Sequence, residues 1–95
     1  MDYSEIEAII EGWFGPGQVL LTWKDGKDNQ CNLWLELNEG EFVIESQRYS
    51  ASGNSEADFD GCIKTFPSLR DAKDALTGFA LIASDYCDLH CEIME

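Results

Sequence analysis

The sequence predicts one α+β domain: an N-terminal helix, a four-stranded antiparallel meander and a C-terminal helix, with both helices packed on one sheet face. Apolar residues recur at three- and four-residue intervals near both ends of the chain, and they alternate with polar residues in between. The 95 residues are 44% hydrophobic and include three Trp and five Phe, enough for one packed core. We therefore expect residues 1–95 to form a single domain.

The first helix is predicted over Tyr3 to Phe14. Ser4 and Glu7 have the spacing of a capping box, so Ser4 is the expected N-cap. The Gly-Pro-Gly sequence at residues 15–17 is expected to end the helix, because proline lacks an amide donor and glycine accepts left-handed conformations. The apolar stripe of this helix consists of Tyr3, Ile6, Ile9, Ile10 and Trp13.

The sheet is predicted from four segments with strand character. The second of them alternates most regularly and places Leu33 and Trp34 on opposite faces. In the third, residues 42–44 are all apolar, so two registers one residue apart stay open. Residues 50–57 have the composition of a mobile loop. The predicted strands are Gln18 to Lys24, Gln30 to Leu37, Glu41 to Tyr49 and Phe59 to Phe66.

The second helix is predicted to begin after Pro67, because Ser68 and Asp71 repeat the capping-box spacing. The tail at residues 85–95 is compatible with an extension of this helix or with an edge strand. The apolar side of the helix is predicted to consist of Leu69, Ala72, Ala75, Leu76, Phe79, Ile82 and Ala83.

The charge of the chain indicates the kind of partner it binds. Six basic residues against 19 acidic ones give a formal net charge of −13, which repels nucleic acids and anionic membranes and attracts cationic proteins. We therefore predict a basic protein partner, no direct nucleic-acid binding and no membrane association, although such a charge also serves solubility alone. No apolar run of about 20 residues is present, and we expect a cytoplasmic protein.

One cluster has metal-ligand character, Cys87, His90 and Cys91, because on a helix these spacings place the three side chains near one another. A small zinc-binding or thiol protein is thus one alternative hypothesis. A fourth zinc ligand is not evident, and nearby acids would raise a thiol pKa by like-charge repulsion. Since no Gly-rich phosphate loop is present either, we predict a protein that is not an enzyme and needs no metal or cofactor.

Surface recognition is the remaining interpretation. Acidic residues are concentrated on the second hairpin and on the loop that follows it, and two aromatic residues beside them are candidate anchors. For Trp34 the alternative is a core position beneath a helix on the second sheet face. The predicted partner-binding residues are Trp34, Glu36, Glu45, Tyr49, Glu56, Asp58 and Asp60.

In size, charge and layout the whole chain resembles bacterial immunity proteins that neutralise nuclease toxins, and also small phage proteins that imitate nucleic acid. The resemblance involves no motif, so no family's residues can be transferred to it. It implies an acidic inhibitor that covers the basic cleft of a nucleic-acid-processing enzyme. Our leading hypothesis is an immunity protein against a nuclease-type toxin; the alternatives are a phage-encoded inhibitor of a host defence enzyme and an adaptor or homo-oligomer subunit.

Overall fold

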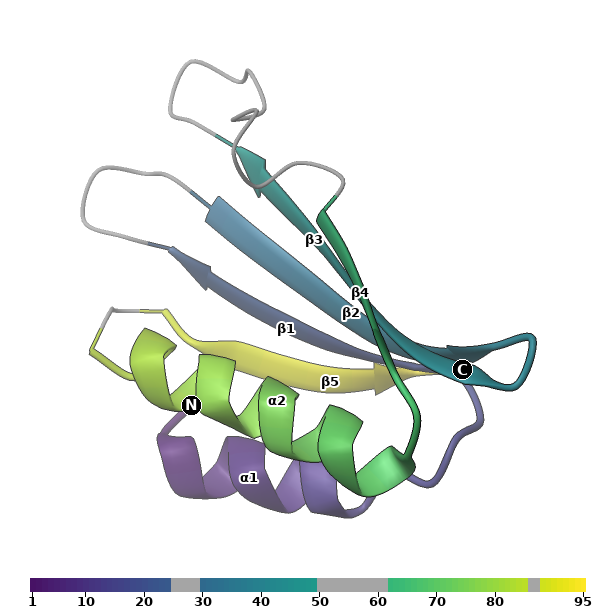
Figure 1. Ribbon diagram of the computed structural model, residues 1–95. Coiled ribbons are helices and arrows are strands. Elements are labelled where there is room, and N and C mark those ends of the chain that lie inside the picture. Colours follow the sequence, from purple (N-terminus) through teal and green to yellow (C-terminus); the bar gives the residue numbers. More distant parts are fainter. Residues whose placement is uncertain (25–29, 50–61, 86–87) are drawn as a thin grey trace.

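The computed structural model describes residues 1–24, 30–49, 62–85 and 88–95 and contains two helices and one antiparallel sheet (Figure 1). The α+β prediction is confirmed, but the sheet has five described strands where four were predicted. The elements are α1 (Tyr3–Glu11), β1 (Gln18–Lys24), β2 (Gln30–Asn38), β3 (Glu41–Tyr49), β4 (Cys62–Phe66), α2 (Leu69–Ala83) and β5 (His90–Met94).

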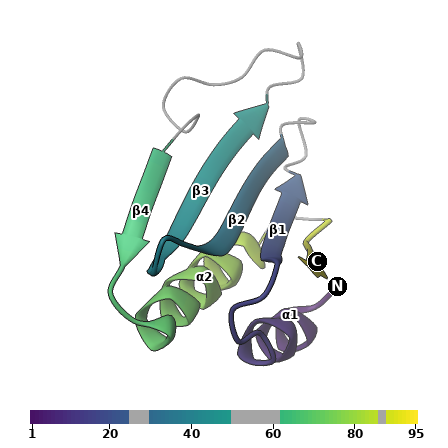
Figure 2. The same ribbon diagram turned by 90° about the vertical axis from the view of Figure 1, so that its right-hand side faces the viewer.

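The strands are ordered β4-β3-β2-β1-β5, and every neighbouring pair is antiparallel. The first four strands form the predicted meander. The tail forms the fifth strand, so of the two alternatives for residues 85–95 the edge strand is correct for His90–Met94. Helix α2 leads from β4 at one edge of the sheet to β5 at the other, and both helices lie on the same side of the sheet (Figures 1 and 2).

Helix α1 begins at Tyr3, as predicted, but its N-cap differs from the expected one and it ends before Phe14. The N-cap is Asp2, whose Oδ1 accepts a hydrogen bond from the backbone N–H of Glu5 at 3.0 Å, and Ser4 lies inside the helix. The helix ends at Glu11, followed by Gly12 as its C-cap. Trp13 therefore reaches the core from the connecting segment, where its Nε1–H donates to the carbonyl oxygen of Pro16 at 2.8 Å.

The N-cap of α2 is Ser68, as predicted, with its Oγ accepting from the backbone N–H of Asp71 at 3.1 Å. The predicted apolar side of this helix is wrong at one position. Ile82 is 65% exposed, whereas Ala80 is fully buried. The buried positions of the helix include Ala72, Leu76, Ala80 and Ala83, which follow one another at intervals of three and four residues.

The core lies between the helix pair and one face of the sheet, and it resolves the register of β3. Ile44 is buried against the helices, and the Phe42 ring meets the Trp13 ring edge to face at 6.3 Å between centroids. Val43 consequently lies on the opposite sheet face. The fully buried core residues include Ile6, Ile10, Val19, Leu21, Leu35 and Leu76.

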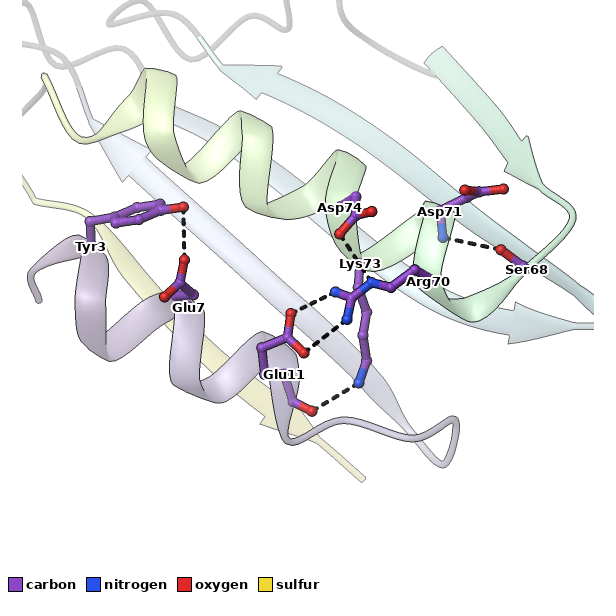
Figure 3. A network of polar contacts seen from close by, with 8 residues as sticks. All are labelled: Tyr3, Glu7, Glu11, Ser68, Arg70, Asp71, Lys73 and Asp74. Carbon is purple, nitrogen blue, oxygen red and sulfur yellow. Dashed lines mark hydrogen bonds and ion pairs between the residues drawn. The ribbon is translucent and has the colours of Figure 1, made fainter.

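Two basic side chains of α2 join the two helices at the C-terminal end of α1 (Figure 3). Lys73 is only 3% exposed; its Nζ donates to the carbonyl oxygen of Glu11 at 2.9 Å and lies 4.2 Å from the Phe14 ring centroid. Arg70 donates to both carboxylate oxygens of Glu11, at 2.6 and 3.1 Å, and to Asp74 at 3.0 Å. The hydrogen bonds from Arg70 lower the pKa of the Glu11 carboxyl.

Gly17 is required where the connection from α1 enters the sheet. Its φ is +70°, and a Cβ atom there would collide with the carbonyl oxygen of Met94 and approach the Cα of Glu95. Gly40 has a similar φ of +82° but no atom within 4 Å of a Cβ position. A substitution at Gly40 therefore measures the energetic cost of a left-handed backbone alone. The same substitution at Gly17 adds the cost of a collision with the end of β5.

Gly40→Ala is expected to lower the free energy of unfolding by about 1 kcal/mol, the cost of a left-handed alanine. Gly17→Ala adds overpacking, so we expect a further loss of at least about 1 kcal/mol. Urea unfolding followed by circular dichroism measures both. Equal losses for the two variants would contradict the close approach of residues 94 and 95 to Gly17.

Lys73→Met is expected to lower the free energy of unfolding by about 1–2 kcal/mol, because it leaves the Glu11 carbonyl without its side-chain donor. The same unfolding measurement tests this. Lys24→Met, at an exposed lysine, is the matched control and should stay within about 0.5 kcal/mol of the original protein. A Lys73 variant as stable as this control would show that the contact contributes nothing.

Candidate protein-interaction surface

One face of the sheet, here called the open face, points away from both helices. Side chains alternate between the two faces of a strand, so the neighbours of buried core residues belong to the open face. Along β1 and β2 buried residues alternate with partly exposed ones, as with Leu33 and Trp34. No helix in the described part of the chain covers this face (Figure 2).

The register places five open-face residues in one row across the sheet. Leu20 pairs with Glu92 on one side and with Trp34 on the other. Trp34 pairs in turn with Glu45, and Glu45 with Ile63. Residues paired in this way have Cβ atoms about 4.5–5.5 Å apart. The Cβ atom of Trp34 therefore lies between those of Leu20 and Glu45.

The neighbouring row adds a second carboxylate close to Trp34. Glu36 lies two residues along β2 on the same face, and its Oε2 accepts a hydrogen bond from Nε2 of Gln18, its partner on β1, at 2.7 Å. This bond restrains the Glu36 side chain. Val43, its partner on β3, and Met94, the partner of Gln18 on β5, place further apolar groups in this row.

Each of the five strands contributes one apolar side chain to the open face. Leu20, Trp34 and Val43 are partly exposed, Met94 is 45% exposed and Ile63 is 58% exposed. Apolar groups that stay together at a surface indicate contact with another molecule more strongly than scattered ones do. We call this set the apolar band: Leu20, Trp34, Val43, Ile63 and Met94.

Charge on the open face is strongly asymmetric. Among the residues that the structure describes there, four are carboxylates and one is a lysine, Lys24, which lies at the far end of β1. Lys24 is four residues from Leu20, about 13 Å along the strand. The surroundings of the apolar band are therefore anionic. The four carboxylates are Glu36, Glu41, Glu45 and Glu92.

Three of the predicted binding residues, Trp34, Glu36 and Glu45, are brought together on the open face. The alternative placement of Trp34 beneath a helix is wrong for the described chain. Tyr49 is the last residue of β3 and pairs with Gln30 through the backbone. The remaining predicted binding residues, Glu56, Asp58 and Asp60, lie outside the described residues.

Six residues of this surface were not among the predicted binding residues: Leu20, Glu41, Val43, Ile63, Glu92 and Met94. Leu20 lies between Val19 and Leu21, and the alternation assigns these two, rather than Leu20, to the apolar face of the strand. For Val43 the ambiguous register of residues 42–44 did not indicate a face. Ile63 follows a glycine that weakens the strand pattern. The contributions of β5, Glu92 and Met94, could be recognised only once the tail was assigned to an edge strand.

The hypothesis of a metal site in the tail placed Cys87, His90 and Cys91 on one helix, but His90 and Cys91 lie in a strand. His90 and Cys91 are consecutive residues of β5, so their side chains point to opposite faces of the sheet. Cys91 is 1% exposed, and burial, with a smaller effect of the Glu92 charge, raises its pKa to about 12. Cys87 lies outside the described residues. Within the described ranges, no three His, Cys, Asp or Glu residues are grouped so that they could hold a metal ion.

Comparisons of this chain with protein-family models, with curated protein sequences and with solved structures found no match. Neither described helix is long and apolar enough to cross a membrane.

The Cys91 thiol is expected to resist alkylation in the folded protein. With a pKa of about 12, on the order of one thiol in ten thousand is ionised at pH 8, and the thiolate is the reactive form. Treatment with iodoacetamide at pH 8 followed by peptide mass spectrometry should find Cys91 unmodified, and modified once the protein is denatured in urea. Equally fast modification in both states would contradict its burial.

Proposed function

We propose that this protein is a stoichiometric inhibitor that binds a basic protein partner through the open face, and that the partner is a nucleic-acid-cleaving enzyme of the toxin class. The observation that carries the proposal is the apolar band set among carboxylates, on a chain with a net charge of −13. This combination fits a cationic protein surface with some apolar groups at its centre.

The apolar and the acidic residues have different parts in the proposed binding. Burial of Trp34 and its aliphatic neighbours supplies affinity, because interface energy is concentrated in a few central side chains, often Trp. The carboxylates of Glu36 and Glu45 accelerate encounter with a basic partner and select against acidic ones. Affinity therefore depends on both groups, and the association rate on the carboxylates.

The proposed target class follows from charge. Enzymes that cleave nucleic acids need basic clefts to hold phosphates. The positive potential of such a cleft also attracts a protein surface that carries several carboxylates. The apolar band is about 19 Å wide, since it crosses five strands spaced about 4.8 Å apart. If a surface of this width binds over such a cleft, it blocks the entry of a substrate strand.

The double charge reversal Glu36→Lys with Glu45→Lys tests the proposal. Partner proteins are captured from lysate of the source cells on the immobilised protein, identified by mass spectrometry, and then purified for titration calorimetry. We expect a basic nucleic-acid-cleaving enzyme that is inhibited at one-to-one stoichiometry. The double variant should bind it at least about tenfold more weakly, because it places like charges against a basic surface.

Glu7→Lys with Asp85→Lys is the matched control, because both residues are exposed, lie outside the sheet and change the net charge equally. It should retain most of the affinity. Circular dichroism checks that both double variants are folded. The proposal is wrong if no basic enzyme is inhibited, and the assigned surface is wrong if the two double variants bind equally.

A further inference from the structure

We infer that the open face recognises arginine: the indole of Trp34, flanked by the carboxylates of Glu45 and Glu36, binds an arginine side chain of the partner in preference to lysine. This inference rests on the proposed function and specifies the chemical group that the partner presents. The juxtaposition of one partly exposed indole with two carboxylates on adjacent positions carries it.

The register places two glutamates next to Trp34 on the open face, one across the strands and one along β2. Glu45 is directly opposite Trp34 on β3, with Cβ atoms about 5 Å apart. Glu36 is two residues further along β2 on the same face, about 7 Å away along the strand. In the proposed complex, a guanidinium stacked on the indole pairs with both carboxylates.

Arginine suits this arrangement better than lysine does. Its guanidinium is planar, so it stacks on an aromatic ring while its N–H groups, which lie in its own plane parallel to the ring, donate to neighbouring carboxylates. The ammonium of lysine is a compact, strongly hydrated charge that cannot stack and pair with both carboxylates in this way. The hydrogen bond from Gln18 restrains Glu36, which reduces the entropy lost when the arginine binds.

The rest of the open face favours one kind of occupant. Leu20, paired with Trp34 on β1, offers apolar contact for the methylene groups of an arginine side chain. A second copy of this acidic chain would bring further negative charge against the carboxylates and is disfavoured. Charge complementarity thus indicates a basic segment of another protein.

The experiment compares two capped pentapeptides, Arg-Gly-Arg-Gly-Arg and Lys-Gly-Lys-Gly-Lys, which carry equal charge. Each is titrated into the folded protein in low-salt buffer, and the indole N–H resonances are followed by nuclear magnetic resonance. We expect the arginine peptide to bind about three- to fivefold more tightly and to shift the Trp34 resonance most. Trp13 and Trp23, on the core side of the sheet, serve as internal controls.

Two variants make the assignment specific. Trp34→Leu should abolish the preference for arginine while retaining weak binding by charge, and Glu45→Gln should reduce it, whereas Glu7→Gln, on α1, should leave it unchanged. Equal affinity of the original protein for the two peptides overturns the inference, as does a preference that survives in both Trp34→Leu and Glu45→Gln.

The outcome is separable from that of the proposed function. If the peptides bind equally but the charge-reversed open face still loses a captured basic enzyme, the partner is held by charge without arginine recognition. If arginine is preferred but no basic enzyme is captured or inhibited, the open face binds an arginine-bearing protein of another class. Each arm thus tests one proposal.

Discussion

The contact between Lys73 and the end of α1 fixes one end of the helix pair whose apolar side chains cover the sheet. A buried ammonium on the Glu11 carbonyl is favourable because the last carbonyls of a helix lack intrahelical partners and carry partial negative charge. The Arg70 bridge to Glu11 adds an exposed ion pair, which alone would contribute little. Both contacts join α1 to α2, and the apolar sides of the two helices together cover a single face of the sheet.

That one-sided covering explains the character of the other face. A five-stranded antiparallel sheet is stable with one face on the core and one face toward water, so the open face has no structural need for large apolar residues. It nevertheless carries one on every strand, among carboxylates. Burial in the core does not account for these residues, which is why we relate the apolar band to binding.

Much of the fold was predictable because its signals are local. The bounds of β1 and β3 agree with the prediction, since the turn residues that delimit them stand beside clear strand patterns. Asp2 and Ser4 are both good N-caps, and each is followed three residues later by a glutamate, so the capping-box spacing that favoured Ser4 does not distinguish them. For β5 the sequence left an edge strand and a helix extension as alternatives, because the strand is short and has one buried residue, Cys91.

The candidate site was predictable only in part, for a related reason. Trp34, Glu36 and Glu45 belong to one hairpin, where alternation and turn geometry set the register, so their proximity follows from local sequence. Glu92 and Met94 join them through the pairing of β5 with β1, two strands distant along the chain, which no local pattern encodes. Ile63 joins them from the next strand of the meander, where Gly61 weakens the strand pattern. The face can thus be recognised from β2 and β3 alone, but its extent cannot.

The path of α2 between opposite edges of the sheet affects how the protein is completed during synthesis. β1 is an interior strand of the finished sheet, yet its outer edge finds its partner only when residues 90–94 follow, some 70 residues later. A nascent chain that already holds the meander therefore exposes an unpaired strand edge with good hydrogen-bonding groups. The net charge of −13 opposes pairing of this edge with another copy of the chain until β5 is in place.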